Sequence, residues 1–108
     1  MLYIVTALYI EAKPLISLFS LKKDNAYTKF QVFSNENIKL IISGTGKIKS
    51  ATALTYLISN KDIKDNDYII NIGFIASSNN NSRLGDIVYI SKIQNAYSDT
   101  TFYPEMIY

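Results

Sequence analysis

An almost unbroken apolar stretch near the start of the chain, LYIVTAL at residues 2–8, is the feature that most constrains the fold. It is rich in β-branched and aromatic residues, and consecutive apolar positions are typical of a strand covered on both faces, as in α/β proteins. Residues 10–20 then change to helical spacing. Pro14 is expected in the first turn of this helix, because proline has no N–H to donate to the carbonyl four residues earlier. A buried strand that leads directly into a helix predicts an α/β sheet.

The remaining pattern extends this prediction along the chain. Residues 29–35 and 38–43 predict two hairpin strands, residues 48–59 a second helix, and residues 68–74 and 85–91 two further strands, the first of them buried. The second helix is expected to share one apolar stripe among Ile48, Ala51, Leu54, Tyr56 and Leu57. With no internal repeat or linker, we expect a single domain over residues 1–108, built on a mixed sheet with helices packed on it.

Residue usage excludes several classes of function. The 108 residues include no Cys and no His, which excludes a thiol nucleophile, a Ser-His-Asp triad and the usual zinc sites. The net charge is +2 without a basic block, so no nucleic-acid partner is predicted. No stretch approaches the roughly 20 apolar residues of a membrane span, and the apolar start lacks a signal-peptide pattern. We therefore expect a cytoplasmic protein that does not bind a membrane.

The segment IISGTGKIKSATA carries two glycines and a lysine between a predicted strand and a predicted helix. A Walker A loop is excluded, because Ile41 stands where its first glycine would be and Ile48 where its Ser or Thr would be. The dinucleotide pattern G-x-G-x-x-G fits Gly44 and Gly46, but Lys49 replaces its third glycine. Two interpretations stay open: a loop that cradles part of a ligand at a helix N-terminus, and a tight corner that needs positive φ angles.

Two other features are candidate sites. Glu11 lies near the predicted start of the first helix, where it is either a solvated residue favoured by the helix dipole or a general base held ionised by the helix N-terminus. Residues 71–78, NIGFIASS, leave a predicted buried strand at its carboxyl end, where ligands of open α/β sheets tend to bind. The small residues Gly73 and Ala76 either permit contact with a flat ligand or only relieve crowding.

Three stretches agree in order and spacing with one family: ALYIEAKPL at residues 7–15, SGTGKIKSATA at residues 43–53, and IINIGF with LGDIV within residues 69–88. Together they resemble the purine nucleoside phosphorylase and 5′-methylthioadenosine/S-adenosylhomocysteine nucleosidase superfamily, and its nucleosidase branch in particular. The resemblance implies a mixed-sheet, three-layer phosphorylase/hydrolase-like α/β fold, of which this chain resembles the N-terminal half. It further implies a homodimer and neither a metal nor an organic cofactor.

The resemblance also implies roles for individual residues. Glu11 falls where the nucleosidases place the glutamate that activates the water attacking the ribose anomeric carbon. The positions that would line the substrate pocket are Leu8, Thr45, Phe74, Ile75 and Ala76.

Two aromatic residues, Phe102 and Tyr103, fall near a family segment that closes the pocket of a neighbouring subunit. The chain departs from the family at Phe74 to Ser77, where the family usually has Ser or Thr followed by Ala-Gly-Gly or Ala-Gly-Ser. Bulky side chains there predict a narrower or reshaped pocket.

The family chemistry needs residues that the resemblance places in the second half of the domain: a Met-Glu pair that binds the ribose and an Asp that protonates the departing base. Losing a general acid alone typically costs about 10²–10⁴-fold in rate. We therefore expect this chain by itself to be inactive, and the full domain to cleave the N-glycosidic bond of a 5′-thio-substituted purine nucleoside with water. Two alternatives remain: phosphorolysis with inorganic phosphate, and a degenerate half-domain with only a folding or dimerisation role.

Overall fold

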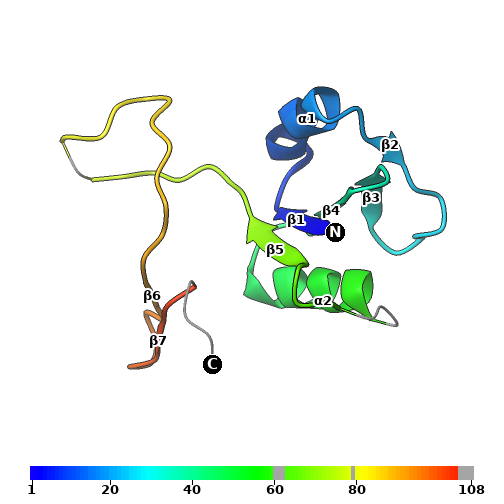
Figure 1. The fold of residues 1–108 in the computed structure, drawn as a ribbon. Helices are drawn as coiled ribbons and strands as arrows, with labels where there is room; N and C mark the ends of the chain where they lie inside the picture. The colour runs from blue at the N-terminus through cyan, green and yellow to red at the C-terminus, as the bar shows by residue number, and fades with distance from the viewer. Residues whose placement is uncertain (60–62, 79, 105–108) are drawn as a thin grey trace. The chain divides into compact units, whose positions relative to one another are not determined.

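The computed structural model describes residues 1–59, 63–78 and 80–104, and the chain divides into two compact units, Met1–Ile75 and Ala76–Tyr108. The first unit holds a five-stranded mixed sheet and two helices (Figure 1), so the predicted α/β class is confirmed. Its elements in chain order are β1 (Leu2–Thr6), α1 (Tyr9–Leu18), β2 (Lys22–Lys23), β3 (Gln31–Ser34), β4 (Ile38–Ile42), α2 (Lys47–Ile58) and β5 (Tyr68–Asn71).

The strand order of this sheet is β2-β3-β4-β1-β5. Strand β1 pairs in parallel with both β4 and β5, with Leu2 opposite Ile38 on one side and Tyr68 on the other. Strands β2 and β3 continue the sheet beyond β4 with antiparallel pairings. The carboxyl ends of three adjacent parallel strands therefore lie at the same end of the sheet.

The core forms on both faces of the central strands, as the apolar run of β1 predicts. Tyr3 and Val5 point to the α2 face, where they form one cluster with Val32, Ile41, Ala53 and Leu57. Ile4 points to the opposite face and clusters with Ala12, Leu21, Ile38 and Leu40. The two helices lie on opposite faces of the sheet (Figure 1). This alternation explains why β1 is apolar at consecutive positions.

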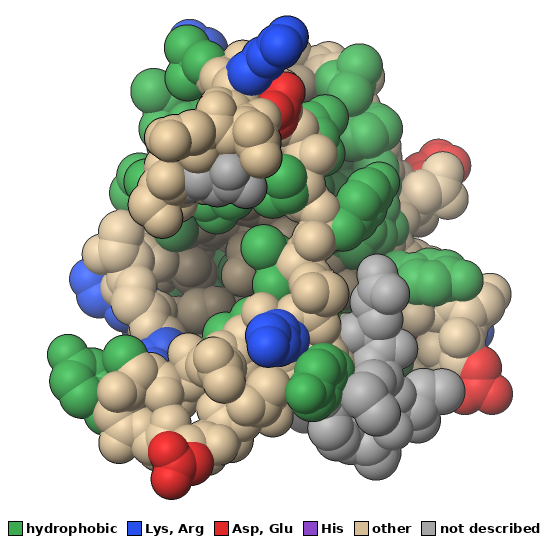
Figure 2. Space-filling view, turned by 90° about the vertical axis from the view of Figure 1, so that its left-hand side faces the viewer, with side chains coloured by type: hydrophobic (Ala, Val, Ile, Leu, Met, Phe, Trp, Pro, Cys, Tyr) green, Lys and Arg blue, Asp and Glu red, His purple; other side chains and the backbone are tan. Residues whose placement is uncertain are grey.

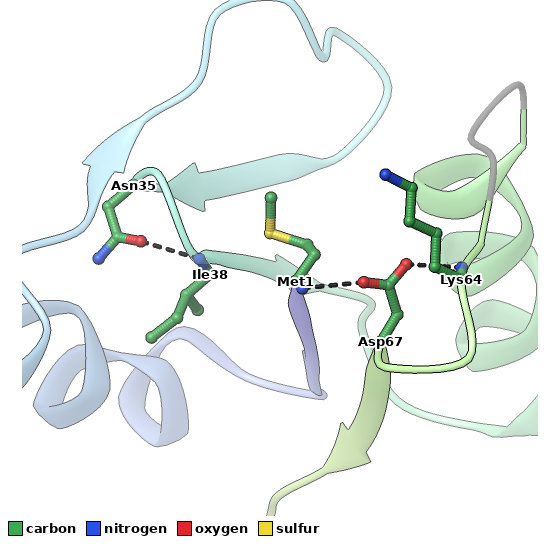
Figure 3. A network of polar contacts seen from close by, with 5 residues as sticks. All are labelled: Met1, Asn35, Ile38, Lys64 and Asp67. Atoms are coloured by element: carbon green, nitrogen blue, oxygen red, sulfur yellow. Dashed lines mark hydrogen bonds and ion pairs between the residues drawn. The ribbon is translucent and has the colours of Figure 1, made fainter.

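The predicted hairpin is present as the antiparallel pair β3 and β4. Its turn is closed by the side chain of Asn35, whose Oδ1 accepts hydrogen bonds from the backbone N–H groups of Asn37 and Ile38, both at 2.8 Å (the second is drawn in Figure 3). An Asn that bonds to the backbone two and three residues ahead is a typical turn former. The sequence therefore located this turn correctly.

The placement of Pro14 in the first turn of the first helix was wrong. Helix α1 begins at Tyr9, so Pro14 is its sixth residue and lies inside the helix. The early start is stabilised by Glu11, whose carboxylate accepts the backbone N–H of Leu8, the residue that precedes the helix. This contact satisfies one of the N–H groups that a helix start leaves without an intrahelical partner.

The predicted apolar stripe of α2 is wrong at two positions. Ala53 and Leu57, four residues apart, are fully buried, whereas Ile48 is 79% exposed and Ala51 is also exposed. Tyr56 is half-buried, and its ring packs against those of Tyr27 and Phe30 at centroid distances of 5.8 and 5.6 Å. The buried face of α2 is therefore centred on Ala53 and Leu57, more than one turn after Ile48, where the predicted stripe begins.

The prediction of a buried strand at residues 68–74 was also wrong in part. Strand β5 ends at Asn71 and lies at the edge of the sheet, bonded to β1 alone. The two core clusters include no residue of β5, and its side chains are exposed, from 41% for Ile70 to 68% for Tyr68. An apolar strand at an uncovered edge has no facing layer in which to bury its side chains.

Among its described residues, the second unit contains one short hairpin, β6 (Ile93–Gln94) with β7 (Thr101–Phe102). The strand predicted at residues 85–91 is absent: Asp86 closes a turn with Arg83, and Ile87 and Tyr89 are 88% and 90% exposed. A strand pattern needs a partner strand to form a ladder. Among the described residues of the whole chain, no helix is long and apolar enough to cross a membrane.

Candidate functional site

The candidate site lies in the first unit, where the parallel strands β4, β1 and β5 end. The backbone links these ends closely: Ser43 N–H donates to Thr6 O at 2.8 Å, Gly44 N–H to Ala7 O at 2.9 Å, and Ile72 N–H to Val5 O at 3.0 Å. The β1–α1 connection therefore lies between the segments that follow β4 and β5. The carboxyl ends of adjacent parallel strands are where open α/β sheets bind ligands.

Glu11 is the central side chain of this site. It is the third residue of α1 and only 9% exposed. Its Oε1 accepts the Leu8 N–H at 2.8 Å, and its Oε2 accepts the Phe74 N–H at 2.7 Å, across 63 positions of sequence. The interpretation of Glu11 as a solvated surface residue is therefore wrong, because its carboxylate is buried and bonded to the end of β5.

The backbone at Gly73 lies against this carboxylate. A Cβ atom built on Gly73 would be 2.8 Å from Oε2 of Glu11, which is shorter than the contacts that Cβ atoms make in real structures. The φ angle of Gly73 is outside the positive range that requires glycine. A side chain at residue 73 would therefore meet the Glu11 carboxylate, although the backbone there does not itself require glycine.

The glycine loop between β4 and α2 forms a tight corner. Gly44 and Gly46 have φ angles of +83° and +96°, a region that favours glycine, as the corner interpretation predicted. Thr45, between them, is exposed. The Gly44 bond to Ala7 brings this loop beside the residue that precedes Leu8. Predicted pocket positions from two distant segments thus lie on adjacent strand ends.

A buried hydroxyl at the end of β1 was not singled out by sequence reasoning. Thr6 is fully buried, and its Oγ1 is the buried side-chain polar atom without a hydrogen-bond partner among the described residues. Ser43, on the neighbouring strand end, donates its Oγ hydrogen bond to the Gly44 carbonyl at 2.8 Å. The available signal was that Thr6 is the polar residue within the apolar run of residues 2–8.

The structure brings together part of the predicted set. Glu11, Leu8 and Phe74 are joined by hydrogen bonds, while the side chains of Leu8, Phe74 and Ile75 are 46%, 73% and 63% exposed. The other predicted positions, Ala76, Phe102 and Tyr103, belong to the second unit. The first unit thus supplies an anchored carboxylate with exposed apolar side chains beside it.

The remaining surface features lie elsewhere. A shallow depression on α2 is lined by Ala51, Thr52, Thr55, Tyr56 and Ser59, none of them a predicted site residue. Within the described residues, no three Cys, His, Asp or Glu side chains are grouped closely enough to hold a metal ion. On the face shown in Figure 2, positive and negative side chains are scattered among apolar and neutral ones.

Comparison with known proteins finds no matching family model, no similar curated protein and no similar solved structure.

Proposed function

We propose that this chain forms the N-terminal portion of a purine nucleosidase-like enzyme with a phosphorylase/hydrolase-like fold. The enzyme would cleave the N-glycosidic bond of a 5′-thio-substituted purine nucleoside by attack of water. The supporting observation is the buried Glu11 carboxylate, anchored by two backbone N–H groups where parallel strands end. A general base is effective when its orientation is fixed before the substrate binds.

The hydrogen bonds of Glu11 leave room for this role. An ionised carboxylate has about four acceptor positions, two on each oxygen. Each oxygen of Glu11 accepts one backbone N–H in the structure. Within the described part of the chain, each oxygen therefore keeps a second acceptor position, which the proposal assigns to a water molecule while the carboxylate stays anchored.

In the proposed step, Glu11 takes a proton from this water as the water oxygen forms a bond to the anomeric carbon. The bond between that carbon and the purine nitrogen breaks, and its electron pair leaves with the purine. The purine then needs a proton from an acid, and the ribose hydroxyls need hydrogen-bond partners. We assign both to a segment outside this chain, so the chain alone is expected to be inactive.

The side chains next to Glu11 support an apolar substrate portion. Leu8 follows β1, and Phe74 and Ile75 follow β5, and all three expose large apolar surfaces. A purine ring or a thioether substituent could contact such surfaces, with Thr45 at the adjoining corner. A homodimer in which Phe102 and Tyr103 close the partner's pocket remains part of this proposal, as does inorganic phosphate as an alternative co-substrate.

A second candidate is a degenerate half-domain with only a folding or dimerisation role. The exposure of β5 favours it, because an apolar edge strand is suited to pairing with another chain. The bulky Phe74 and Ile75 favour it as well, since they stand where the resembled family has small residues.

The test is a titration of the isotopically labelled chain with 5′-methylthioadenosine, followed by the backbone amide signals in NMR. We expect signal changes at Leu8, Glu11, Thr45 and Phe74. Glu11→Gln should reduce these changes, and the matched control Glu36→Gln, in the exposed hairpin turn, should leave them intact. Adenine release, measured by chromatography with and without phosphate, should stay at background.

Each other result would change the proposal. Signal changes absent from these amides would favour the degenerate half-domain. Adenine release that depends on phosphate would favour phosphorolysis. Release by this chain with water alone would contradict the need for an acid from another segment.

A further inference from the structure

At the candidate site, the backbone of Gly73 and Phe74 lies against a carboxylate that is far away in sequence. Oε2 of Glu11 is 2.7 Å from the Phe74 nitrogen and 2.8 Å from the place where a Cβ of Gly73 would be. Oε1 is fixed at the same time by the Leu8 N–H. An added Cβ at residue 73 would force Oε2 to shift, and such a shift would lengthen or bend the hydrogen bonds that hold the carboxylate on both sides.

We propose that Gly73 is a positioning residue for Glu11, selected by the space that the carboxylate needs beside the end of β5. This inference rests on the proposed function, in which Glu11 activates water. Gly73 does not touch the reacting atoms. It acts by letting the Phe74 N–H reach the carboxylate, which fixes the direction of the remaining acceptor positions toward the water.

The backbone geometry separates this role from the usual reason for a glycine, which is a positive φ angle. Gly73 lies outside the positive φ range in which glycine is needed, whereas Gly44, Gly46 and Gly85 lie within it. Alanine at a position of compatible φ normally stabilises a protein, because it restricts the unfolded chain. Apart from its chain neighbours, an added Cβ at residue 73 would meet only Oε2 and Cδ of Glu11 among the described residues.

The inference predicts that the destabilisation by Gly73→Ala depends on the residue at position 11 and disappears or reverses when the carboxylate is removed. In the natural chain, Gly73→Ala should raise the unfolding equilibrium constant, by up to about a hundredfold if the hydrogen bond from Phe74 to the carboxylate is broken and by less if it is only lengthened. In a Glu11→Ala background, the same substitution should leave that constant unchanged or lower it by about twofold to fivefold. In the matched Glu36→Ala background, the destabilisation should equal that in the natural chain.

Two readouts on the natural chain and on Gly73→Ala complete the test. The first is the Phe74 amide, whose downfield NMR signal and slow hydrogen exchange should be lost in the variant. The second is the amide response to 5′-methylthioadenosine, which a merely structural contact would not change. It should be present in the natural chain and at least fivefold weaker in the variant, at a temperature where both are folded.

The outcomes separate this inference from the proposed function. A ligand response of equal strength in both proteins would overturn the positioning role and leave the proposed function standing. No response in either protein would overturn the proposed function, and the positioning role with it, even where the Phe74 signal confirms the contact. Equal destabilisation by Gly73→Ala in all backgrounds would show that the carboxylate is not what excludes a side chain.

Discussion

The two edges of the five-stranded sheet differ in how they meet solvent. Strand β2 is two residues long and consists of Lys22 and Lys23, both exposed. Strand β5 is four residues long, carries no charge, and exposes Tyr68, Ile69 and Ile70. Short, lysine-bearing strands are the usual protection of a sheet edge against pairing with another chain. One edge of this sheet is protected in this way and the other is not.

The difference extends to what fixes each edge in place. Beyond β2, residues 24–30 are fixed by side chains of the sheet and of α2: Ser34 donates to Asp24, and the Tyr56 hydroxyl accepts the N–H groups of Thr28 and Lys29. These bonds from Lys29 and Thr28 lower the pKa of the Tyr56 hydroxyl. Strand β5, by contrast, is fixed by carboxylates at its two ends, Asp67 before it and Glu11 after it. Polar contacts at the ends locate a strand whose side chains bury little surface.

The largest expected effect compares one residue type in the centre and at the unprotected edge. Ile41 of β4 is fully buried, whereas Ile69 of β5 is 46% exposed. Ile41→Ala should lower the free energy of unfolding by about 2–5 kcal/mol, because it removes buried surface and leaves a cavity. Ile69→Ala should change it by less than about 1 kcal/mol. Urea denaturation of both variants measures the contrast, and equal losses would show that β5 is covered in solution.

The next prediction concerns association through the unprotected edge. Two copies of β5 can pair without opposing like charges, because Tyr68–Asn71 carries none. Ile69→Lys should therefore weaken self-association by about tenfold, while the reverse change at the other edge, Lys23→Ile, should strengthen it. Sedimentation velocity over a range of concentrations gives the association constants. Association that Ile69→Lys leaves unchanged would place the contact between copies elsewhere.

The same contrast explains how much of the fold the sequence predicted. The central strand β1, the hairpin and the two helices were predicted correctly in type, because hydrophobic periodicity and the Asn35 turn are local signals. The exposure of β5 and the missing strand at residues 85–91 were not predicted, because burial depends on which elements cover a strand. An apolar pattern indicates that a strand is suited to a buried position. It does not show whether another element packs against that strand.

The candidate site was predictable to a similar degree. Glu11 was selected from its place near the helix start, but neither of the sequence interpretations included its bond to Phe74, which spans 63 positions. Gly73 was noted as small, while its reason, the carboxylate beside it, is a tertiary contact. The start of α1 ahead of Pro14 depends on the same carboxylate through Leu8. The contact between Glu11 and Phe74, which spans 63 positions, has no signature in a single sequence.

The smallest expected effect concerns the start of β5, which Asp67 precedes. The Asp67 carboxylate accepts hydrogen bonds from the Met1 ammonium group at 2.8 Å and from the Lys64 backbone N–H at 2.9 Å (Figure 3). The bond from the terminal amine, followed by that from Lys64, holds the pKa of Asp67 below its usual 3.8. A carboxyl whose pKa is lowered by folding stabilises the folded state above its unfolded pKa, and this contribution is lost as the pH falls through the lower folded value.

Asp67→Asn should therefore lower the urea midpoint slightly at neutral pH, and the difference from the natural chain should vanish as the pH is lowered below 3.8. Added salt should also reduce the difference, because part of it comes from an ion pair whose Met1 side is partly exposed to solvent. The neighbouring exposed Asp65→Asn removes the same charge without the bonds of Asp67 and is the matched control. If Asp67→Asn behaved like Asp65→Asn at every pH, the start of β5 would be located by its backbone bonds to β1, and Glu11 would be the described carboxylate that fixes this edge.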